Sequence, residues 1–444
     1  MSMRFPLQSA GVLLVVLVLV CLTISQTAAT AVGSSMMFRG NPEHMGDFTS
    51  AAGGPMDNFL IKWRNPDPIS LFGTSTPAVV DDVVYVGSGT SYPPEGYVYA
   101  IDAVEGRLLK TFETRNLVVS SPAVLDAGTQ KIVYVGDGDG WVYAFNADTG
   151  AKIWEKQKGA AIQSSPVVTV DQGTESEYTV YIGCNDNFVY ALDAMTGEER
   201  WKFPTRGQIW SSPAVARVGT DTLVFVGSND NFVYAINDKD GTEAWSFPTG
   251  GQVWSSPAVT QIGQDTVVFV GSNDNKVYAI DARTGGNFWN PPFDTGNLVS
   301  TSPAIAQVGQ DTIVFVGSGS KLYAINAITG IEKWVVTMWT AAGTPSVADG
   351  IVYVGGYYYL YGYDAATKSE KVREYTSNWF PRSSSTLVVV DGTIYFGGPD
   401  GGLWVRGVHK PLADFTADKT EETTDQYLSV TFTDQSLYNP KSFK

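Results

Sequence analysis

The stretch that decides the fold is "GSNDNFVYAIN" (227–237), which recurs as "GCNDNFVYALD" (183–193) and "GSNDNKVYAID" (271–281). Each copy has a polar turn followed by a strand-forming run of Val, Tyr and Ile or Leu. Equivalent places hold "DGDG" (137–140) and "PDGG" (399–402), which share a tolerance of left-handed backbone but no ligand set. A calcium loop is the alternative, but it would need a longer run with a bidentate acid further on. We therefore interpret the Asn-Asp-Asn triplets as hairpin turns.

The repeat continues along most of the chain. A Ser/Thr-Pro-apolar step recurs at spacings of 42 to 47 residues, followed by a V-[YF]-[VI]-G strand, a turn, a "YAID"-like strand, a Thr-Gly pair and, in most copies, a tryptophan. Such a unit contains four short strands and cannot bury both of its faces alone, but radial stacking covers them. The prolines are Pro77, Pro122, Pro166, Pro213, Pro257, Pro303 and Pro345, and a degenerate eighth copy begins at Ser383.

The number of blades follows from the hairpins. The eighth hairpin, "TIYFGGPDGGLWV" (393–405), lacks a fourth strand, whereas "NFLIKWRNP" (58–66) precedes the first repeat and has no other partner. We expect an all-β, eight-bladed β-propeller of four-stranded antiparallel blades, in which this N-terminal strand completes the last blade and removes the free edge. Seven blades are the alternative if the seventh or eighth copy is irregular.

Tryptophans recur at one register of the repeat. A buried indole removes about 150–250 Å² of surface from water, so one indole per blade is best explained by packing between neighbouring blades. The Thr-Gly pair before it is turn chemistry, because glycine takes positive φ without strain. The predicted docking tryptophans are Trp63, Trp154, Trp201, Trp245, Trp289 and Trp334.

The assembled motif A-x-D-x-x-T-G-x-x-x-W, as in "ALDAMTGEERW" (191–201) and "AIDARTGGNFW" (279–289), resembles the repeat of the pyrroloquinoline quinone (PQQ)-like propeller superfamily. The segment "FRGNPEHMGD" (38–47) is similar to the start of such domains, and the resemblance covers roughly residues 37–408. It implies the fold and leaves the function open. The superfamily includes quinoprotein dehydrogenases, scaffold subunits of outer-membrane assembly and uncharacterised surface proteins.

Both ends of the chain carry further signals. Residues 1–31, with an apolar run of about 15 residues and an A-x-A site, are typical of a secretory signal peptide. Residues 32–410 would be the propeller, with no transmembrane segment in the mature chain. Residues 411–444 resemble the start of a polycystic kidney disease (PKD) domain and would form an incomplete β-sandwich segment. We expect a secreted or cell-surface monomer without an internal disulfide, because Cys184 is the only cysteine after the signal peptide.

Several function classes lack support in the sequence. A net charge of −16 disfavours nucleic acid as a partner. The two histidines, His44 and His409, are too few for a zinc site or a catalytic triad and lie outside the repeats. The resemblance implies PQQ and calcium for the quinoprotein enzymes, but the adjacent cysteine pair that those enzymes often have is absent. We expect no cofactor and no catalytic residue, and PQQ and calcium are the cofactors to test.

Aromatic residues collect in the loops that join strand two to strand three and one blade to the next, which lie on one face of a propeller. Flat aromatic faces stack on ligands while neighbouring polar groups orient them. For Trp210 and Trp254 the alternative is wedging between blades. The candidate ligand-binding residues are Trp210, Trp254, Trp339, Tyr357, Tyr358, Trp379, Arg206, Gln208, Gln252 and Arg382, with Asp186, Asp230 and Asp274 as a charged rim.

The sequence therefore predicts an exported, non-enzymatic binding or scaffold module that recognises a surface protein or a glycan. Two alternatives remain open at this point. One is a PQQ- and calcium-dependent oxidoreductase, and the other is a scaffold for envelope-protein assembly.

Overall fold

The computed structural model describes residues 35–36, 60–64, 75–91, 94–170, 177–339, 341–356, 359–375, 387–390, 392–397, 403–407, 415–422 and 428–434. These residues form strands, turns and loops and contain no helix, so none of them forms a helix that could span a membrane.

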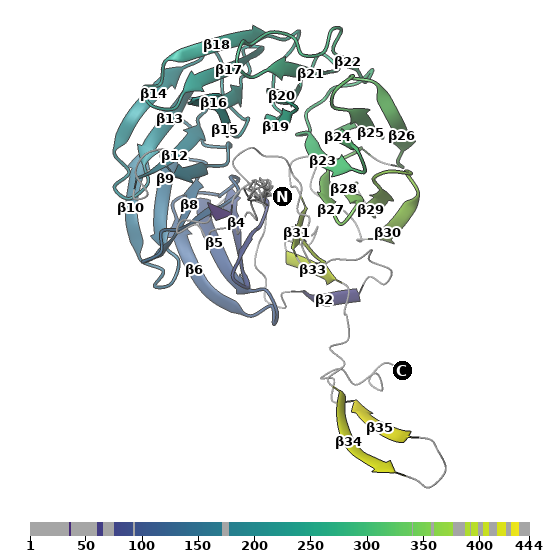
Figure 1. Ribbon diagram of the computed structural model, residues 1–444. Helices are drawn as coiled ribbons and strands as arrows, with labels where there is room; N and C mark the ends of the chain where they lie inside the picture. Colours follow the sequence, from purple (N-terminus) through teal and green to yellow (C-terminus); the bar gives the residue numbers. More distant parts are fainter. Residues whose placement is uncertain are drawn as a thin grey trace, which may run out of the picture.

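Eight antiparallel sheets stand around a common axis, with the first strand of each blade innermost (Figure 1). Blade one is β3 (Ala78–Val80), β4 (Val83–Ser91), β5 (Pro94–Asp102) and β6 (Leu108–Thr114). Blade two is β7 (Ala123–Asp126), β8 (Lys131–Gly136), β9 (Trp141–Asn146) and β10 (Lys152–Gln157), with β1 (Ser35–Met36) added beside β7. Blade three is β11 (Val167–Val170), β12 (Tyr178–Gly183), β13 (Phe188–Asp193) and β14 (Glu199–Pro204). Blade four is β15 (Ala214–Val218), β16 (Asp221–Gly227), β17 (Phe232–Asn237) and β18 (Glu243–Pro248).

The second half of the ring repeats this order. Blade five is β19 (Ala258–Ile262), β20 (Asp265–Gly271), β21 (Lys276–Asp281) and β22 (Phe293–Asp294). Blade six is β23 (Ala304–Val308), β24 (Asp311–Ser318), β25 (Lys321–Asn326) and β26 (Glu332–Thr337). Blade seven is β27 (Ser346–Ala348), β28 (Ile351–Gly355), β29 (Tyr359–Asp364) and β30 (Glu370–Tyr375). Blade eight is β31 (Val388–Val390), β32 (Thr393–Gly397), β33 (Leu403–Gly407) and, as its outer strand, β2 (Leu60–Arg64).

The ring closes through the N-terminal strand. β2 pairs antiparallel with β33, in a register that sets Leu60 opposite Gly407 and Trp63 opposite Val405, and β3 contacts β31 next to the axis. The predicted eight-bladed ring is confirmed, and the seven-bladed alternative is wrong. The core consists of the apolar faces of neighbouring blades, since the buried clusters join residues of adjacent sheets.

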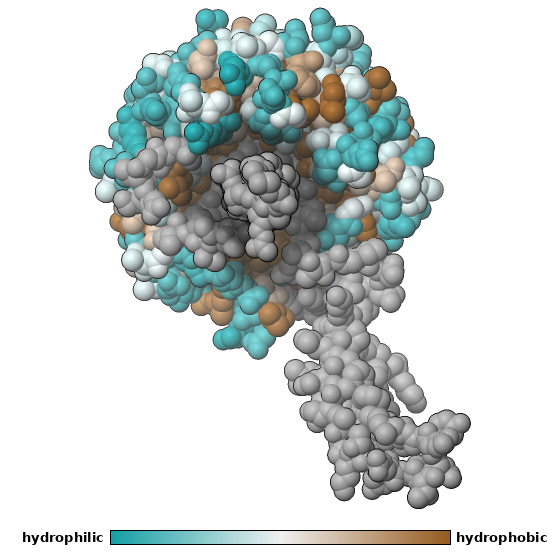
Figure 2. All heavy atoms as spheres, viewed as in Figure 1, coloured by the Kyte–Doolittle hydropathy of each residue, from teal (hydrophilic) through white to brown (hydrophobic). Residues whose placement is uncertain are grey.

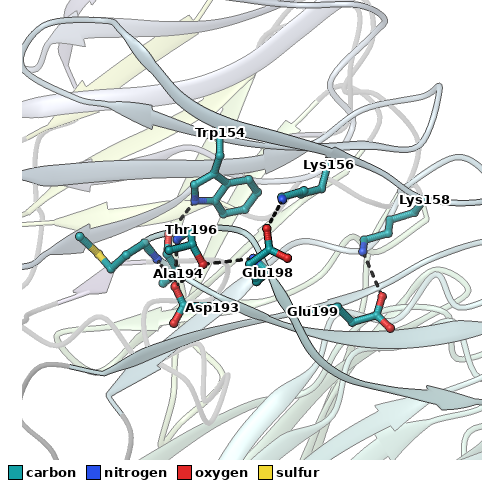
Figure 3. A network of polar contacts seen from close by, with 9 residues as sticks. Trp154, Lys156, Lys158, Asp193, Ala194, Thr196, Glu198 and Glu199 are labelled. Carbon is teal, nitrogen blue, oxygen red and sulfur yellow. Dashed lines mark hydrogen bonds and ion pairs between the residues drawn. The ribbon is translucent and has the colours of Figure 1, made fainter.

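Each A-x-D-x-x-T-G-x-x-x-W motif connects two blades. In blade three, Asp193 Oδ1 accepts hydrogen bonds from the backbone N–H of Thr196 (2.9 Å) and from its hydroxyl (2.9 Å), which fixes the turn between β13 and β14. The indole Nε1–H of Trp154 in blade two donates to the Ala194 carbonyl of that turn at 2.9 Å (Figure 3). The same bond to the next blade is made by Trp201, Trp245, Trp289 and Trp334, at 2.6 to 2.9 Å.

In blades one to six, two consecutive Ser/Thr residues precede the repeat proline, and they have different hydrogen-bond partners. The first binds within its own blade, as where Ser255 Oγ accepts the Gly271 N–H at 3.0 Å. The second reaches the neighbouring blade, as where Ser256 Oγ accepts the Ser212 N–H at 2.9 Å. Equivalent bonds form a buried chain of hydroxyls from blade one to blade seven, through Thr76, Ser121, Ser165, Ser212, Ser256, Ser302 and Thr344.

The two ends of the sequence add little to this architecture. Residues 1–31 lie outside the described residues. Beyond the ring, β34 (Phe415–Glu422) and β35 (Leu428–Asp434) pair with each other as a separate two-stranded sheet. The signal peptide and the PKD-like segment therefore stay predictions.

Candidate functional site

We define the loop face as the side of the ring that carries the turns between second and third strands and the connections between blades. Backbone hydrogen bonds join these two sets of segments. Asn229 N–H donates to the Gln208 carbonyl at 2.9 Å, and Asn273 N–H donates to the Gln252 carbonyl at 2.9 Å. The opposite face carries the remaining hairpin turns. Figure 2 shows one side of the ring, on which hydrophilic side chains predominate and apolar ones are scattered.

The central aspartate of each Asn-Asp-Asn triplet holds the connection that enters its blade. Asp230 Oδ2 accepts the backbone N–H of Arg206 at 2.8 Å and the hydroxyl of Tyr234 at 2.8 Å, while its Oδ1 accepts the Phe232 N–H at 3.0 Å. Asp186 and Asp274 make the same three kinds of bond. Rather than projecting from a rim, each carboxylate is directed at these protein donors.

The third residue of each triplet makes the turn. Asn187, Asn231 and Asn275 have φ of 73°, 74° and 75°, in the left-handed region that asparagine tolerates better than most residues. The prediction that these triplets are turns is therefore confirmed.

The tyrosines bonded to these aspartates remain protonated well into the alkaline range. Burial is the main cause that raises the pKa of Tyr190, Tyr234 and Tyr278, and the hydrogen bond to the aspartate raises it further. Burial likewise raises the pKa of Cys184 to about 12, which keeps this thiol neutral at physiological pH.

Trp210 and Trp254 lie against each other on the loop face. They occupy the same position of two successive blade connections, their ring centroids are 4.9 Å apart, and the ring planes are inclined by 38°. Both side chains are half-buried, so part of each indole remains in contact with solvent. The pair is thus a half-buried aromatic cluster at the loop face.

Unsatisfied polar atoms accompany this pair. Among the described residues, the Nε1–H groups of Trp210 and Trp254 are buried without a hydrogen-bond acceptor. The Oδ1 atoms of Asn185, Asn229 and Asn273 are buried without a donor. Leaving such a group unpaired costs about 1–3 kcal/mol. The turn itself therefore does not explain why the first asparagine of each triplet buries an unpaired side-chain oxygen.

Trp339 is the most exposed large apolar side chain that the structure describes, with 82% of its surface accessible. It lies in the connection from β26 to β27, next to Met338, whose N–H donates to the Ser320 carbonyl at 2.8 Å. Leu298, 51% exposed, lies in the preceding connection, and its carbonyl accepts the Ser318 hydroxyl at 3.2 Å. Trp339 and Leu298 therefore lie in the two connections whose backbones are bonded to the turn of blade six.

The other predicted ligand-binding residues fall into two groups. Arg206, Gln208 and Gln252 have exposed side chains on the loop face, in the same two connections as Trp210 and Trp254. Tyr357, Tyr358, Trp379 and Arg382 lie outside the described residues. Trp63 is placed in β2, but its side chain is not among those described.

The cofactors that the family resemblance implies, PQQ and calcium, can be tested against the donor groups of this face. Calcium needs six to eight oxygen ligands. The carboxylates of Asp186, Asp230 and Asp274 are already engaged by backbone and tyrosine donors. Within the described parts of the chain, no group of three or more His, Cys, Asp or Glu could hold a metal ion. These residues do not fit a calcium-supported quinone site, and we derive no redox step from them.

Comparison with known proteins identifies relatives of this ring. A family model described as outer membrane protein assembly factor BamB matches residues 61–208 and 185–406. BamB from Moraxella catarrhalis has a similar structure, with 17% identity, a TM-score of 0.60, and coverage of 80% of this chain and 98% of that one. No curated protein matches the sequence significantly.

Quinoprotein enzymes have the same architecture. The quinohemoprotein alcohol dehydrogenase ADHIIG from Pseudomonas putida HK5 is similar at 15% identity and a TM-score of 0.65, covering 88% of this chain and 83% of its own. A europium-containing methanol dehydrogenase is similar at 13% identity and a TM-score of 0.64, covering 85% and 89%. At these identities the likeness concerns the fold alone.

Proposed function

Because the chain belongs to the family described as outer membrane protein assembly factor BamB, whose members are PQQ-like β-propellers, we propose that it is an exported, non-enzymatic scaffold that docks a protein partner on its loop face. The signal-like residues 1–31 support export, and the family's description supports a role at the cell envelope. The partner would be a surface or envelope protein.

The observation that carries this proposal is Trp339. An indole that is 82% exposed contributes little to the stability of the ring, whereas its burial against a partner would be strongly favourable. Tryptophan is also enriched among the residues that dominate binding energy at protein interfaces. Leu298, in the preceding connection, is a second exposed apolar side chain on the loop face.

Affinity capture with matched variants tests the proposal. Tagged wild-type protein, Trp339→Ala and Ile331→Ala would be incubated with detergent-solubilised membranes of the producing organism, and bound proteins would be quantified by mass spectrometry. Ile331 is a suitable control because it is 67% exposed but lies in the turn before β26, on the opposite face. A hot-spot contribution of about 2 kcal/mol corresponds to a roughly 30-fold loss of affinity.

We expect a protein that is retained by the wild type and by Ile331→Ala and is depleted by Trp339→Ala. Equal retention by all three proteins, or no specific retention at all, would contradict docking through this surface.

The oxidoreductase alternative makes a different prediction. A ligand at about 100 times its dissociation constant stabilises a protein by roughly 2.7 kcal/mol. We expect no change in thermal unfolding with PQQ, calcium or both, because the loop-face carboxylates are committed to internal donors. A raised melting temperature together with quinone absorbance that survives gel filtration would favour the enzyme.

A further inference from the structure

The indole pair on the loop face is a local departure from the repeat. Trp210 and Trp254 each stand three residues before the proline of the next blade, and the neighbouring connections have Gln163 and Ser300 at this position. Those blades form the same four-stranded sheets without an indole. The fold therefore does not require the pair, and its half-exposed, mutually stacked rings need another explanation.

The exposed polar side chains in the two connections that carry the pair are amides, together with the guanidinium of Arg206. Gln208 and Gln252 precede the two indoles by two residues and are exposed, and Gln163 is exposed in the connection before them. The backbone N–H of Asn229 is bonded to the Gln208 carbonyl, so Asn229 lies against the connection that carries Trp210. These amides and the guanidinium can hydrogen-bond a polar ligand that stacks on the aromatic surface.

The buried polar atoms without a hydrogen-bond partner include both donors and acceptors. The indole Nε1–H groups are donors without an acceptor, and the Oδ1 atoms of Asn185, Asn229 and Asn273 are acceptors without a donor, within the described residues. A hydroxyl group both donates and accepts, so a polyhydroxylated ligand can satisfy both kinds. Because these atoms are buried, the proposed binding requires the half-exposed indoles to move.

We propose that the Trp210–Trp254 pair, with Asn185, Asn229 and Asn273, forms a binding site for the pyranose rings of a glycan. The apolar face of a sugar ring would stack on the indoles, and its hydroxyls would bond to the amide oxygens and indole N–H groups. The site is separate from Trp339 and goes beyond the proposed docking function.

Ligand-observed NMR with maltotriose, cellotriose and chitotriose as probes tests this site. Trp210→Ala and Trp254→Ala would be compared with Trp339→Ala, which removes an exposed indole of the same face outside the pair. We expect at least one trisaccharide to bind the wild type saturably and to bind Trp339→Ala equally well. Its affinity should fall at least tenfold in both Trp210→Ala and Trp254→Ala, with unchanged melting temperatures.

The conservative variant Trp210→Phe guards against a folding defect, because it retains a ring for stacking and should recover part of the lost affinity. The proposal is wrong if none of the three probes binds, if binding survives both alanine variants, or if PQQ, an anion, binds in place of every sugar. The capture experiment depends on Trp339 and not on this pair, so either proposal can fail without the other.

Discussion

Gly285 shows how one residue of the repeat serves two purposes. Its φ of +70° belongs to the left-handed region, and a Cβ at this position would lie 2.7 Å from the Trp245 side chain of the preceding blade. The glycine therefore permits both the turn and the close approach of the docking indole. Gly197, Gly241 and Gly330 have the same relation to Trp154, Trp201 and Trp289.

Replacement of Gly285 by alanine should be more destabilising than the backbone strain alone. Gly263→Ala is the matched control, because its φ is +62° and nothing lies within 4 Å of the added Cβ. We expect the free energy of unfolding to fall by about 1–2 kcal/mol in the control. In Gly285→Ala it should fall by a further 1–3 kcal/mol, roughly, because the added methyl group overpacks against the indole. Urea unfolding of both variants measures this difference. Equal decreases in the free energy of unfolding would show that contact of the added Cβ with the indole does not destabilise the ring.

The chain of buried hydroxyls makes a second prediction for a single residue. Ser256→Ala leaves the buried N–H of Ser212 without its acceptor, so the free energy of unfolding should fall by about 1–3 kcal/mol. Ser246→Ala is the control, because Ser246 is exposed and its loss should change stability by less than about 0.5 kcal/mol. A neutral Ser256→Ala would mean that the hydroxyl does not link the blades.

The repeated motif made the docking tryptophans predictable, but the roles of the serines and asparagines were not. Ser255 and Ser256 are identical neighbours, and only the three-dimensional path shows that one binds its own blade and the other the next. Likewise, Asn229 and Asn231 are both part of one turn, yet only Asn231 takes positive φ, and only Asn229 retains an orphaned oxygen. The sequence alone does not show in which direction a given side chain points, so these different roles could not be predicted from it.

At the scale of elements, the strand pattern predicted the ring because each blade repeats the same alternation of strand and turn. The contact between Trp210 and Trp254 could not be predicted in this way, since it depends on the angle between blades four and five and not on either connection alone. The shortening of β22 to Phe293–Asp294, where the other outer strands of complete repeats have six or seven residues, was also not predicted.

β2 is the element whose removal should have the largest effect. It is the outer strand of blade eight, and without it the edge of β33 would be open to other chains. A chain lacking residues 1–64 should melt at a lower temperature and associate, whereas a chain lacking residues 1–59, which retains β2, should remain monomeric. Light scattering after gel filtration measures this, and two monomers of equal stability would contradict closure by β2.

At the scale of the whole molecule, the buried tyrosines predict alkaline unfolding. Burial raises the pKa of Tyr85 and that of Tyr363 to about 12, and it raises the pKa of several other core tyrosines. The pKa of an unfolded tyrosine is about 10. Below this pH both states are protonated, and stability is unaffected. Above it the unfolded state loses protons that the folded state keeps, so stability falls with rising pH.

Urea midpoints between pH 8 and pH 11 measure this loss. We expect a constant midpoint up to about pH 9.5 and a steep decrease above it. Tyr85→Phe should reduce the steepness, because one tyrosine no longer contributes. A midpoint that is constant up to pH 11 would show that these phenols are not held neutral by the fold.

The ring is also shared by enzymes and by an assembly factor, so the fold by itself does not decide the function. On the loop face of this chain, Trp339 and Leu298 are exposed, and the carboxylates of Asp230 and Asp274 are bound by the protein's own donors. The proposed docking function rests on this combination.

Site-specific photo-cross-linking in the producing cells tests the central claim most directly. A photoreactive benzoylphenylalanine would replace Trp339 in one strain and Ile331, on the opposite face, in another. The account predicts a discrete cross-linked protein after illumination at position 339 and none at position 331. No cross-link at position 339, or the same cross-link at both positions, would contradict a docking surface on the loop face.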